Sequence, residues 1–302
     1  MTAMAGERGP DLVIAGAARS GTTMLASLLA RHPNVVLPRI KEPNFFSSNY
    51  ANGFGWYLGL FERPAGGGLL VDASTQYTFP RFMHRSFERL CACSDPFVVY
   101  VVREPIERAF SHFVRTRFYE DANRYGSFSE ALSRDSDILG ASKYDEILEC
   151  LGGALQEDRL LIVPFELITR NRSSAFETVM QWAGIDTEDA VAEDSAEILF
   201  QNESAVIKNK LAKLGFKYLR DTRLYPRIRS IIGPERVRRI RARITTSDGI
   251  PTLKEGLTSC SRIQRDELAT VSDLSRHAVA SWLEAQDERL GLSLSQHCSW
   301  TR

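Results

Sequence analysis

The chain has 302 residues, and its 38 Lys and Arg balance 38 Asp and Glu, so the formal net charge is zero. A zero net charge gives no general attraction to nucleic acid or to an anionic membrane surface. The 43% hydrophobic and 25% charged fractions are ordinary for a folded protein, and this length suffices for one large α/β domain or two.

Neither the apolar runs nor the cysteines indicate a membrane or secreted protein. No apolar run approaches the roughly 20 residues that a membrane-spanning helix needs. The first ten residues lack the apolar core of a signal peptide. The cysteines are odd in number and scattered, which does not suit a disulfide framework. We therefore expect reduced thiols and a cytoplasmic location. The cysteines are Cys91, Cys93, Cys150, Cys260 and Cys298.

The first informative stretch is Asp11 to Leu25, which predicts a short buried strand over 12–15, a glycine-bounded loop and a helix over 22–31. A loop between a strand end and a helix N-terminus presents backbone N–H groups and the positive end of the helix dipole. This arrangement predicts an anion site, typically for phosphate. The candidate binding residues are Ala18, Arg19, Ser20, Gly21, Thr22 and Thr23.

The glycine spacing is close to that of a nucleotide-binding P-loop but departs from its pattern. The G-x-x-x-x-G-K-[ST] motif places a lysine on the β/γ-phosphates and a hydroxyl on magnesium. Here Gly16 and Gly21 keep the spacing, two threonines follow, and the cation lies inside the loop as Arg19. Amides, hydroxyls and one guanidinium suit a phosphate held without a metal.

The next candidate segment is Lys41-Glu-Pro-Asn-Phe-Phe46. Pro43 disfavours a helical Glu42, and the two phenylalanines are expected to anchor the segment in the core. Glu42 could then act as a general base and Lys41 as an anion clamp. A simple surface Lys–Glu pair remains the alternative.

Two further strands are predicted at 69–71 and 97–102, each with polar residues just after its end. The second is a run of six β-branched or aromatic residues, as in a strand buried on both faces of a parallel sheet. Arg103 follows it at the carboxyl end, and Ser111 lies about two turns into a helix over 106–119. An arginine there could clamp a second anion, or it could be a structural arginine.

Taken together and in this order, the three segments resemble the sulfotransferase superfamily that uses 3′-phosphoadenosine-5′-phosphosulfate (PAPS), closest to its heparan sulfate branch and bacterial relatives. The loop around Arg19 is similar to that family's 5′-phosphosulfate loop, which usually carries lysine there. The stretch from Arg103 to Ser111 is similar to its 3′-phosphate motif. The segment containing Glu42 is similar to one whose glutamate is the catalytic base in the heparan enzymes.

The resemblance covers roughly residues 11–185 and departs from the heparan enzymes at three points. Asn44 and Ser47 stand where those enzymes often carry a histidine and an acid. Ala73 replaces a lysine near the end of the second strand. The resemblance therefore implies a PAPS-binding core more strongly than a heparan acceptor.

The remaining segments predict scaffold. We expect a strand over 159–163, helices starting at 127, 144 and 173, and an acidic connector over 186–197. A closing helix over 265–290 has a predicted inner face made of Leu268, Val271, Leu274, Ala278 and Trp282.

Residues 208–254 hold fourteen Lys and Arg against three acidic residues, a net charge of +11, which leaves −11 for the rest of the chain. Apolar residues are interleaved with these charges. Three hypotheses compete: a solvated helical face, a lid over PAPS or an anionic acceptor, and a patch for membrane or nucleic acid.

The sequence thus predicts one α/β domain over 1–302, with a mostly parallel sheet, a P-loop-like 5′-phosphosulfate loop and helices on both faces. A PAPS-binding core spans 11–185 and a basic helical part spans 200–302. The predicted reaction is sulfuryl transfer from PAPS to an acceptor hydroxyl, or less favourably an amine, without a metal. The acceptor would be a carbohydrate or a small molecule.

In this scheme Glu42 is the catalytic base, Lys41 and Arg19 assist, and Arg103 with Ser111 binds the 3′-phosphate. His112 is a lesser candidate for the base. A P-loop kinase and a non-catalytic nucleotide-binding protein remain the alternatives.

Overall fold

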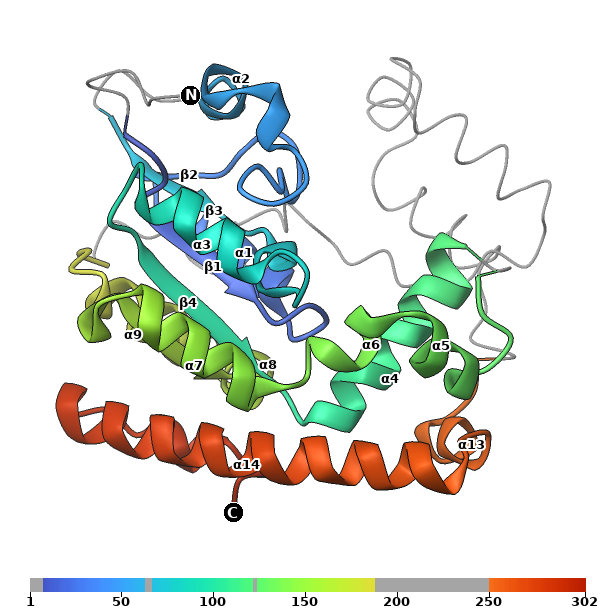
Figure 1. Ribbon diagram of the computed structural model, residues 1–302. Helices are drawn as coiled ribbons and strands as arrows, with labels where there is room; N and C mark the ends of the chain where they lie inside the picture. The colour runs from blue at the N-terminus through green and yellow to red at the C-terminus, as the bar shows by residue number, and fades with distance from the viewer. Residues whose placement is uncertain (1–7, 63–66, 122–123, 188–249) are drawn as a thin grey trace, which may run out of the picture.

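The computed structural model describes residues 8–62, 67–121, 124–187 and 250–302. Its centre is a parallel sheet of five strands in the order β2-β3-β1-β4-β5 (Figure 1). The strands are β1 Leu12–Gly16, β2 Val35–Val36, β3 Leu69–Asp72, β4 Phe97–Val102 and β5 Leu160–Pro164. Strand β1 is the middle strand, so the loop that follows it lies at the centre of one sheet edge.

The strands form where continuous apolar runs can be buried on both faces. Every residue of β1 and β5 is buried, as are all of β4 except Phe97. The predicted strands over 12–15, 69–71, 97–102 and 159–163 are confirmed.

Helices cover both faces of the sheet (Figure 1). Helix α1 (Thr22–Leu29) packs on α9 (Arg172–Trp182), while α3 (Met83–Cys91) packs on α7 (Tyr144–Ala154). The chain crosses the sheet in one direction through α1, from β1 to β2, and in the other through α3, from β3 to β4. Crossovers of the same hand that run in opposite directions place their helices on opposite faces. The predicted α/β fold is therefore confirmed. The shorter helical elements are η1 Tyr50–Asn52, α2 Phe54–Leu58, η2 Thr75–Thr78, α5 Phe128–Arg134, α6 Ser136–Gly140, η4 Glu157–Arg159, α8 Phe165–Arg170, α13 Leu253–Thr258 and η6 Leu294–His297.

Helix α4 (Pro105–Arg115) continues into the π-helical turn η3 (Thr116–Glu120). It rests on a second, smaller apolar cluster, separate from the main core around the sheet, that α5, α6, α13 and α14 complete. Pro105 occupies the first helical turn, and the Glu104 carboxylate caps it by accepting the Glu107 N–H at 2.6 Å. This packing holds α4 at the edge of the sheet.

The closing helix is α14 (Arg262–Leu290), which runs past α7 along the lower side of Figure 1. Its predicted inner face was wrong at Leu274, which is 52% exposed. The buried position is Ser275, whose hydroxyl donates to the Ser142 carbonyl at 2.7 Å and accepts from the Tyr144 N–H at 3.0 Å. A hydrogen-bonded serine therefore takes the place that an apolar pattern assigned to leucine. The predicted acidic connector from residue 188 onward and the basic segment up to residue 249 lie outside the described residues.

Candidate active site

The carboxyl ends of the parallel strands meet around one cleft of about 520 Å³. It is lined by residues that follow every strand: Thr22 after β1, Glu42 after β2, Thr75 after β3, Arg103 after β4 and Phe165 after β5. Ligand crevices of open α/β sheets lie at this edge. The fold thus brings the three predicted segments to one place.

The loop after β1 wraps the N-terminus of α1. Gly21 is left-handed at φ 81° and precedes the first helical residue, and Arg19 is left-handed at φ 71°. The first amides of a helix have no helical partner and point out of its N-terminus. Thr22 and Thr23 line the cleft at this end, as does Ala18. Ser20 is fully buried and does not line the cleft.

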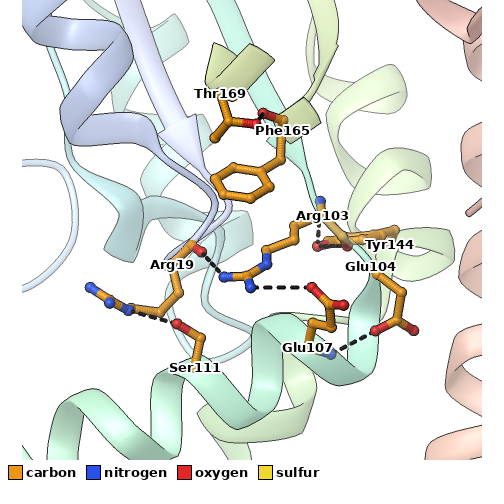
Figure 2. A network of polar contacts seen from close by, with 8 residues as sticks. All are labelled: Arg19, Arg103, Glu104, Glu107, Ser111, Tyr144, Phe165 and Thr169. Atoms are coloured by element: carbon orange, nitrogen blue, oxygen red, sulfur yellow. Dashed lines mark hydrogen bonds and ion pairs between the residues drawn. The ribbon is translucent and has the colours of Figure 1, made fainter. Parts of the chain in front are cut away.

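Arg19 points its guanidinium toward α4. Its Nε donates to the Ser111 hydroxyl at 3.4 Å (Figure 2), and no carboxylate of the described residues lies within 4 Å of it. Burial, followed by the neighbouring charges of Arg115 and Arg103, lowers the pKa of Arg19 to about 10. At neutral pH the group is still a cation, and an anion in the cleft would relieve the repulsion among these arginines.

Arg103 is held from three sides (Figure 2). One terminal nitrogen donates to the Arg19 carbonyl at 3.3 Å, the other to the Glu107 carboxylate at 3.2 Å. Its guanidinium lies 4.8 Å from the centre of the Phe165 ring, a cation–π contact. The side chain is therefore held in position by these contacts, while its buried Nε–H has no partner among the described residues.

Glu42 enters the same cleft from the segment after β2. Its carboxylate accepts a hydrogen bond from Thr75 at 3.3 Å and lies 3.6 Å from the Lys41 ammonium. Glu42 and Asn44 both have left-handed backbones, at φ 52° and 49°. The expected anchors are confirmed, because Phe45 and Phe46 are each 1% exposed and pack in an aromatic cluster with Tyr57.

His112, the lesser candidate for the base, also lines the cleft. Burial and the Arg108 charge lower the pKa of His112 to about 3, so the ring is neutral at physiological pH. A group with so low a pKa is a weak proton acceptor at pH 7.

The wall of the cleft farther along α4 is made of arginine–carboxylate pairs. Arg81 lies 2.7 Å from Asp137, Arg124 lies 2.8 Å from Asp135, and Arg115 lies 3.0 Å from Glu120. The pairing leaves this wall rich in hydrogen-bonding groups but balanced in charge.

Arg108 and Phe165 contribute to the site but were not predicted from the sequence. Arg108 is fully buried; it donates to the Ala18 carbonyl at 3.2 Å, to Ser142 at 2.5 Å and to the Ile138 carbonyl. It thereby ties the loop to α4 and α6. The sequence feature that could have revealed Arg108 is its position inside the Arg103–Ser111 motif. Phe165, directly after the Pro164 strand end, gave no chemical signal of its own.

Comparison with known proteins identifies the family. Residues 9–223 match the sulfotransferase domain model, which is more than half of the chain. An open parallel α/β sheet with a glycine-bounded loop between its middle strand and a helix defines the general class. Within it, this chain belongs to the sulfotransferase domain family, and the resemblance drawn from the three motifs is confirmed.

The relatives that match include heparan sulfate enzymes. The human heparan sulfate glucosamine 3-O-sulfotransferase 3B1 is 32% identical over 108 residues, covering 35% of this chain and 27% of that protein. A bifunctional heparan sulfate N-deacetylase/N-sulfotransferase 1 from Caenorhabditis elegans is 30% identical over 152 residues, covering 48% and 17%. The chain thus spans well under half of these relatives. Among solved structures, a sulfotransferase from Alicyclobacillus acidocaldarius shares the fold, with a TM-score of 0.53, 19% identity and coverage of 75% and 96%.

The predicted cytoplasmic location is wrong. A relative that is 31% identical over 150 residues, covering 45% of this chain and 31% of that protein, is the membrane-associated sulfotransferase kil1 of Dictyostelium discoideum. The inference rested on the cysteines, and two of the five, Cys260 and Cys298, are buried. A buried thiol can stay reduced in any compartment, so these two give no information on location.

Within the described ranges, no helix is both long and apolar enough to cross a bilayer. The same ranges contain no group of three or more His, Cys, Asp or Glu arranged to hold a metal ion.

Proposed function

We propose that this chain transfers the sulfuryl group of PAPS to the hydroxyl of a carbohydrate or small-molecule acceptor. The observation that carries the proposal is the meeting of Arg19, Arg103 and Ser111 at the N-terminus of α1, with Glu42 in the same cleft. These residues supply two positions for anionic groups and one carboxylate in a single cleft. That set suits a nucleotide that carries an anionic group at each of two positions, together with a proton acceptor. We further propose that α14, packed on α7 and β5, belongs to the same domain.

The residues present fit PAPS. The amides at the start of α1, with Thr22, Thr23 and Arg19, would hold the 5′-phosphosulfate. The Arg103 guanidinium and the Ser111 hydroxyl, which both line the cleft, would bind the 3′-phosphate. The Phe165 ring, at the end of β5, offers a face for the adenine.

PAPS supplies an activated sulfuryl group whose displacement leaves adenosine 3′,5′-bisphosphate (PAP). Glu42 would accept the proton of the acceptor hydroxyl as its oxygen attacks. Its hydrogen bond from Thr75 orients the carboxylate. Lys41, whose ammonium lies 3.6 Å from the carboxylate, would add positive charge beside the transferred group. Arg19 would stabilise the charge that develops on the departing oxygen.

The acceptor would lie toward the paired wall formed by Arg81, Arg115 and Arg124 with their carboxylates. Such a wall offers many donors and acceptors but, among the described residues, no excess of positive charge. It therefore suits a hydroxyl-rich acceptor. The heparan sulfate relatives make a saccharide the first class to test.

The proposal is tested by incubating the protein with PAPS and a panel of neutral sugars, sulfated saccharides and phenols, and detecting products by mass spectrometry. We expect one acceptor class to gain a sulfuryl group. Phosphate transfer from MgATP without sulfate transfer from PAPS would instead support the kinase alternative. Binding of PAP without transfer to any acceptor would support a non-catalytic nucleotide-binding protein.

A further inference from the structure

The end of β3 carries a buried carboxylate that makes no contact with the cleft. Asp72 is 0% exposed and accepts three hydrogen bonds: from Ser74 at 2.6 Å, from Tyr77 at 2.7 Å and from Tyr57 at 2.9 Å. No lysine, arginine or histidine of the described residues forms an ion pair with it. A buried carboxylate satisfied only by hydroxyl groups is costly to maintain, so this arrangement calls for a role.

Two of the three donors connect Asp72 to the segment that holds Glu42. The Ser74 hydroxyl, while donating to Asp72, accepts the backbone N–H of Asn44 at 3.0 Å. The Tyr77 hydroxyl, while donating to Asp72, accepts the backbone N–H of Phe46 at 3.5 Å. The carboxylate thus fixes the direction of both hydroxyl groups, because their only protons point at it and their lone pairs face the segment.

The segment needs such support. Glu42 and Asn44 have left-handed backbones, which are unfavourable for residues other than glycine. The Asn44 N–H is two residues from the proposed base, and the adjoining Thr75 holds the Glu42 carboxylate directly.

We propose that Asp72 is a positioning residue for Glu42, acting through Ser74 and Tyr77 on the backbone of residues 42–46. The inference rests on the proposed function, in which Glu42 accepts the acceptor proton. Asp72 touches neither co-substrate nor acceptor. It holds the backbone of residues 42–46 through the two hydroxyl groups, and thereby keeps the Glu42 carboxylate in place.

The tyrosines provide a matched pair of variants. Tyr57 and Tyr77 are both fully buried and both donate to the same oxygen of Asp72. Only Tyr77 also accepts a backbone N–H from the Glu42 segment. Tyr57→Phe therefore removes a hydrogen bond from Asp72 without cutting a link to that segment, whereas Tyr77→Phe removes both.

Ser74→Ala cuts the shorter link. Its control is Ser86→Ala, because the Ser86 hydroxyl is equally buried and lacks a hydrogen-bond partner among the described residues. We expect Ser74→Ala to lower kcat by roughly 10- to 100-fold, since a misplacement of about 1 Å has an effect of this size. Tyr77→Phe should lower kcat more than Tyr57→Phe. The affinity for PAP should change by less than about twofold in all four variants.

The experiment measures kcat, KM for PAPS and PAP affinity for the wild type and these variants, with amide hydrogen exchange at Asn44 and Phe46. Loss of protection at Asn44 together with a fall in kcat in Ser74→Ala supports the inference. If the wild type transfers sulfate and kcat is unchanged in Ser74→Ala, the inference about Asp72 is overturned, while the proposed function stands. Equal decreases of kcat in Tyr57→Phe and Tyr77→Phe also overturn the inference. A wild type that transfers no sulfate overturns the proposed function, and the catalytic role of Asp72 with it.

Discussion

Several side chains that line this cleft already form hydrogen bonds or ion pairs within the protein, and a ligand must replace or share these interactions. Arg103 is the clearest case, because Glu107 occupies one end of its guanidinium while Nε remains unused. Glu107 is half-exposed and one helical turn away on α4. An incoming 3′-phosphate would therefore meet both an attractive arginine and a carboxylate that repels it.

The first prediction concerns Arg103. Arg103→Ala should weaken PAP binding by roughly ten- to a hundredfold, the size of a charge-assisted hydrogen bond. Adenosine 5′-phosphosulfate lacks the 3′-phosphate, so its affinity should hardly change. Isothermal titration calorimetry with both ligands measures this. Equal losses for both ligands would mean that Arg103 is only structural.

The matched change is Glu107→Gln, which keeps the shape of the side chain but removes its charge. We expect PAP to bind a few-fold more tightly, because a like charge near the phosphate is removed. PAP affinity in this variant that equals or falls below that of the wild type would show that Glu107 orients Arg103 rather than competing for it.

The second prediction concerns the base. Glu42→Gln should reduce kcat by roughly 100- to 10,000-fold while PAP affinity stays nearly constant. His112→Asn should reduce kcat by only a few-fold, because a neutral ring with a pKa of about 3 has little basicity at pH 7. Steady-state kinetics of both variants decide between the two residues. The reverse order of effects would assign the base to His112.

At the scale of elements, the junction of β1, its loop and α1 depends on one glycine. Gly21 is left-handed, and a methyl group there would lie 3.1 Å from the Phe165 ring. Gly291, at the end of α14, is also left-handed, but a methyl group there would meet no atom within 4 Å. Alanine at either position would therefore have a strained backbone, but only at Gly21 would its methyl group also contact an aromatic ring.

The third prediction uses this pair. Gly291→Ala should cost only the backbone term, roughly 1–2 kcal/mol of unfolding free energy. Gly21→Ala should cost more than this, and it should also weaken PAP binding because Phe165 and the loop must shift. Urea unfolding and calorimetry measure the two effects. Equal stability losses with unchanged PAP affinity in both variants would refute the packing of Phe165 against the loop.

The elements also show what the sequence could and could not predict. The strands predicted at 97–102 and 159–163, observed at 97–102 and 160–164, were predictable because each is a short continuous apolar run, as expected of a strand buried on both faces. Strand β2 has two residues, too few for any periodic pattern. Leu274 was assigned to the core because apolarity alone cannot reveal that Ser275 makes two buried hydrogen bonds.

Some residues of the candidate site could likewise be predicted from the sequence, and others could not. Arg19, Glu42, Arg103 and Ser111 follow strand ends or a glycine loop, so their meeting follows from the parallel topology. The role of Asp72 could not be predicted, because its partners Tyr57 and Tyr77 join it only in the folded chain. The same holds for the charge balance of the wall that includes Arg81 and Asp137.

At the scale of the whole molecule, two buried titratable groups give opposite pH dependences. Burial raises the pKa of Asp72 to about 6, so the folded state binds this proton more tightly than the unfolded chain. Its contribution to stability therefore falls as pH rises from about 4 to about 6. Burial lowers the pKa of His112 to about 3, so its contribution falls as pH drops below about 6.5.

The fourth prediction separates these contributions by comparing variants. Relative to Asp72→Asn, the wild type should lose about 1 kcal/mol of unfolding free energy between pH 5 and pH 7. Relative to His112→Asn, the wild type should gain stability over the same interval. Urea unfolding at both pH values measures each difference. A difference from Asp72→Asn that does not change with pH would mean that Asp72 titrates normally.

The central claim, that this chain is a PAPS-dependent sulfotransferase, is tested most directly by measuring both products of one reaction. Wild-type protein is incubated with PAPS and a hydroxylated acceptor, and mass spectrometry follows the sulfated acceptor and PAP together. We predict that the two products form in equal amounts, and that Glu42→Gln lowers both rates equally while still binding PAP. PAP and free sulfate without a sulfated acceptor, or no turnover of PAPS with any acceptor, would contradict the claim.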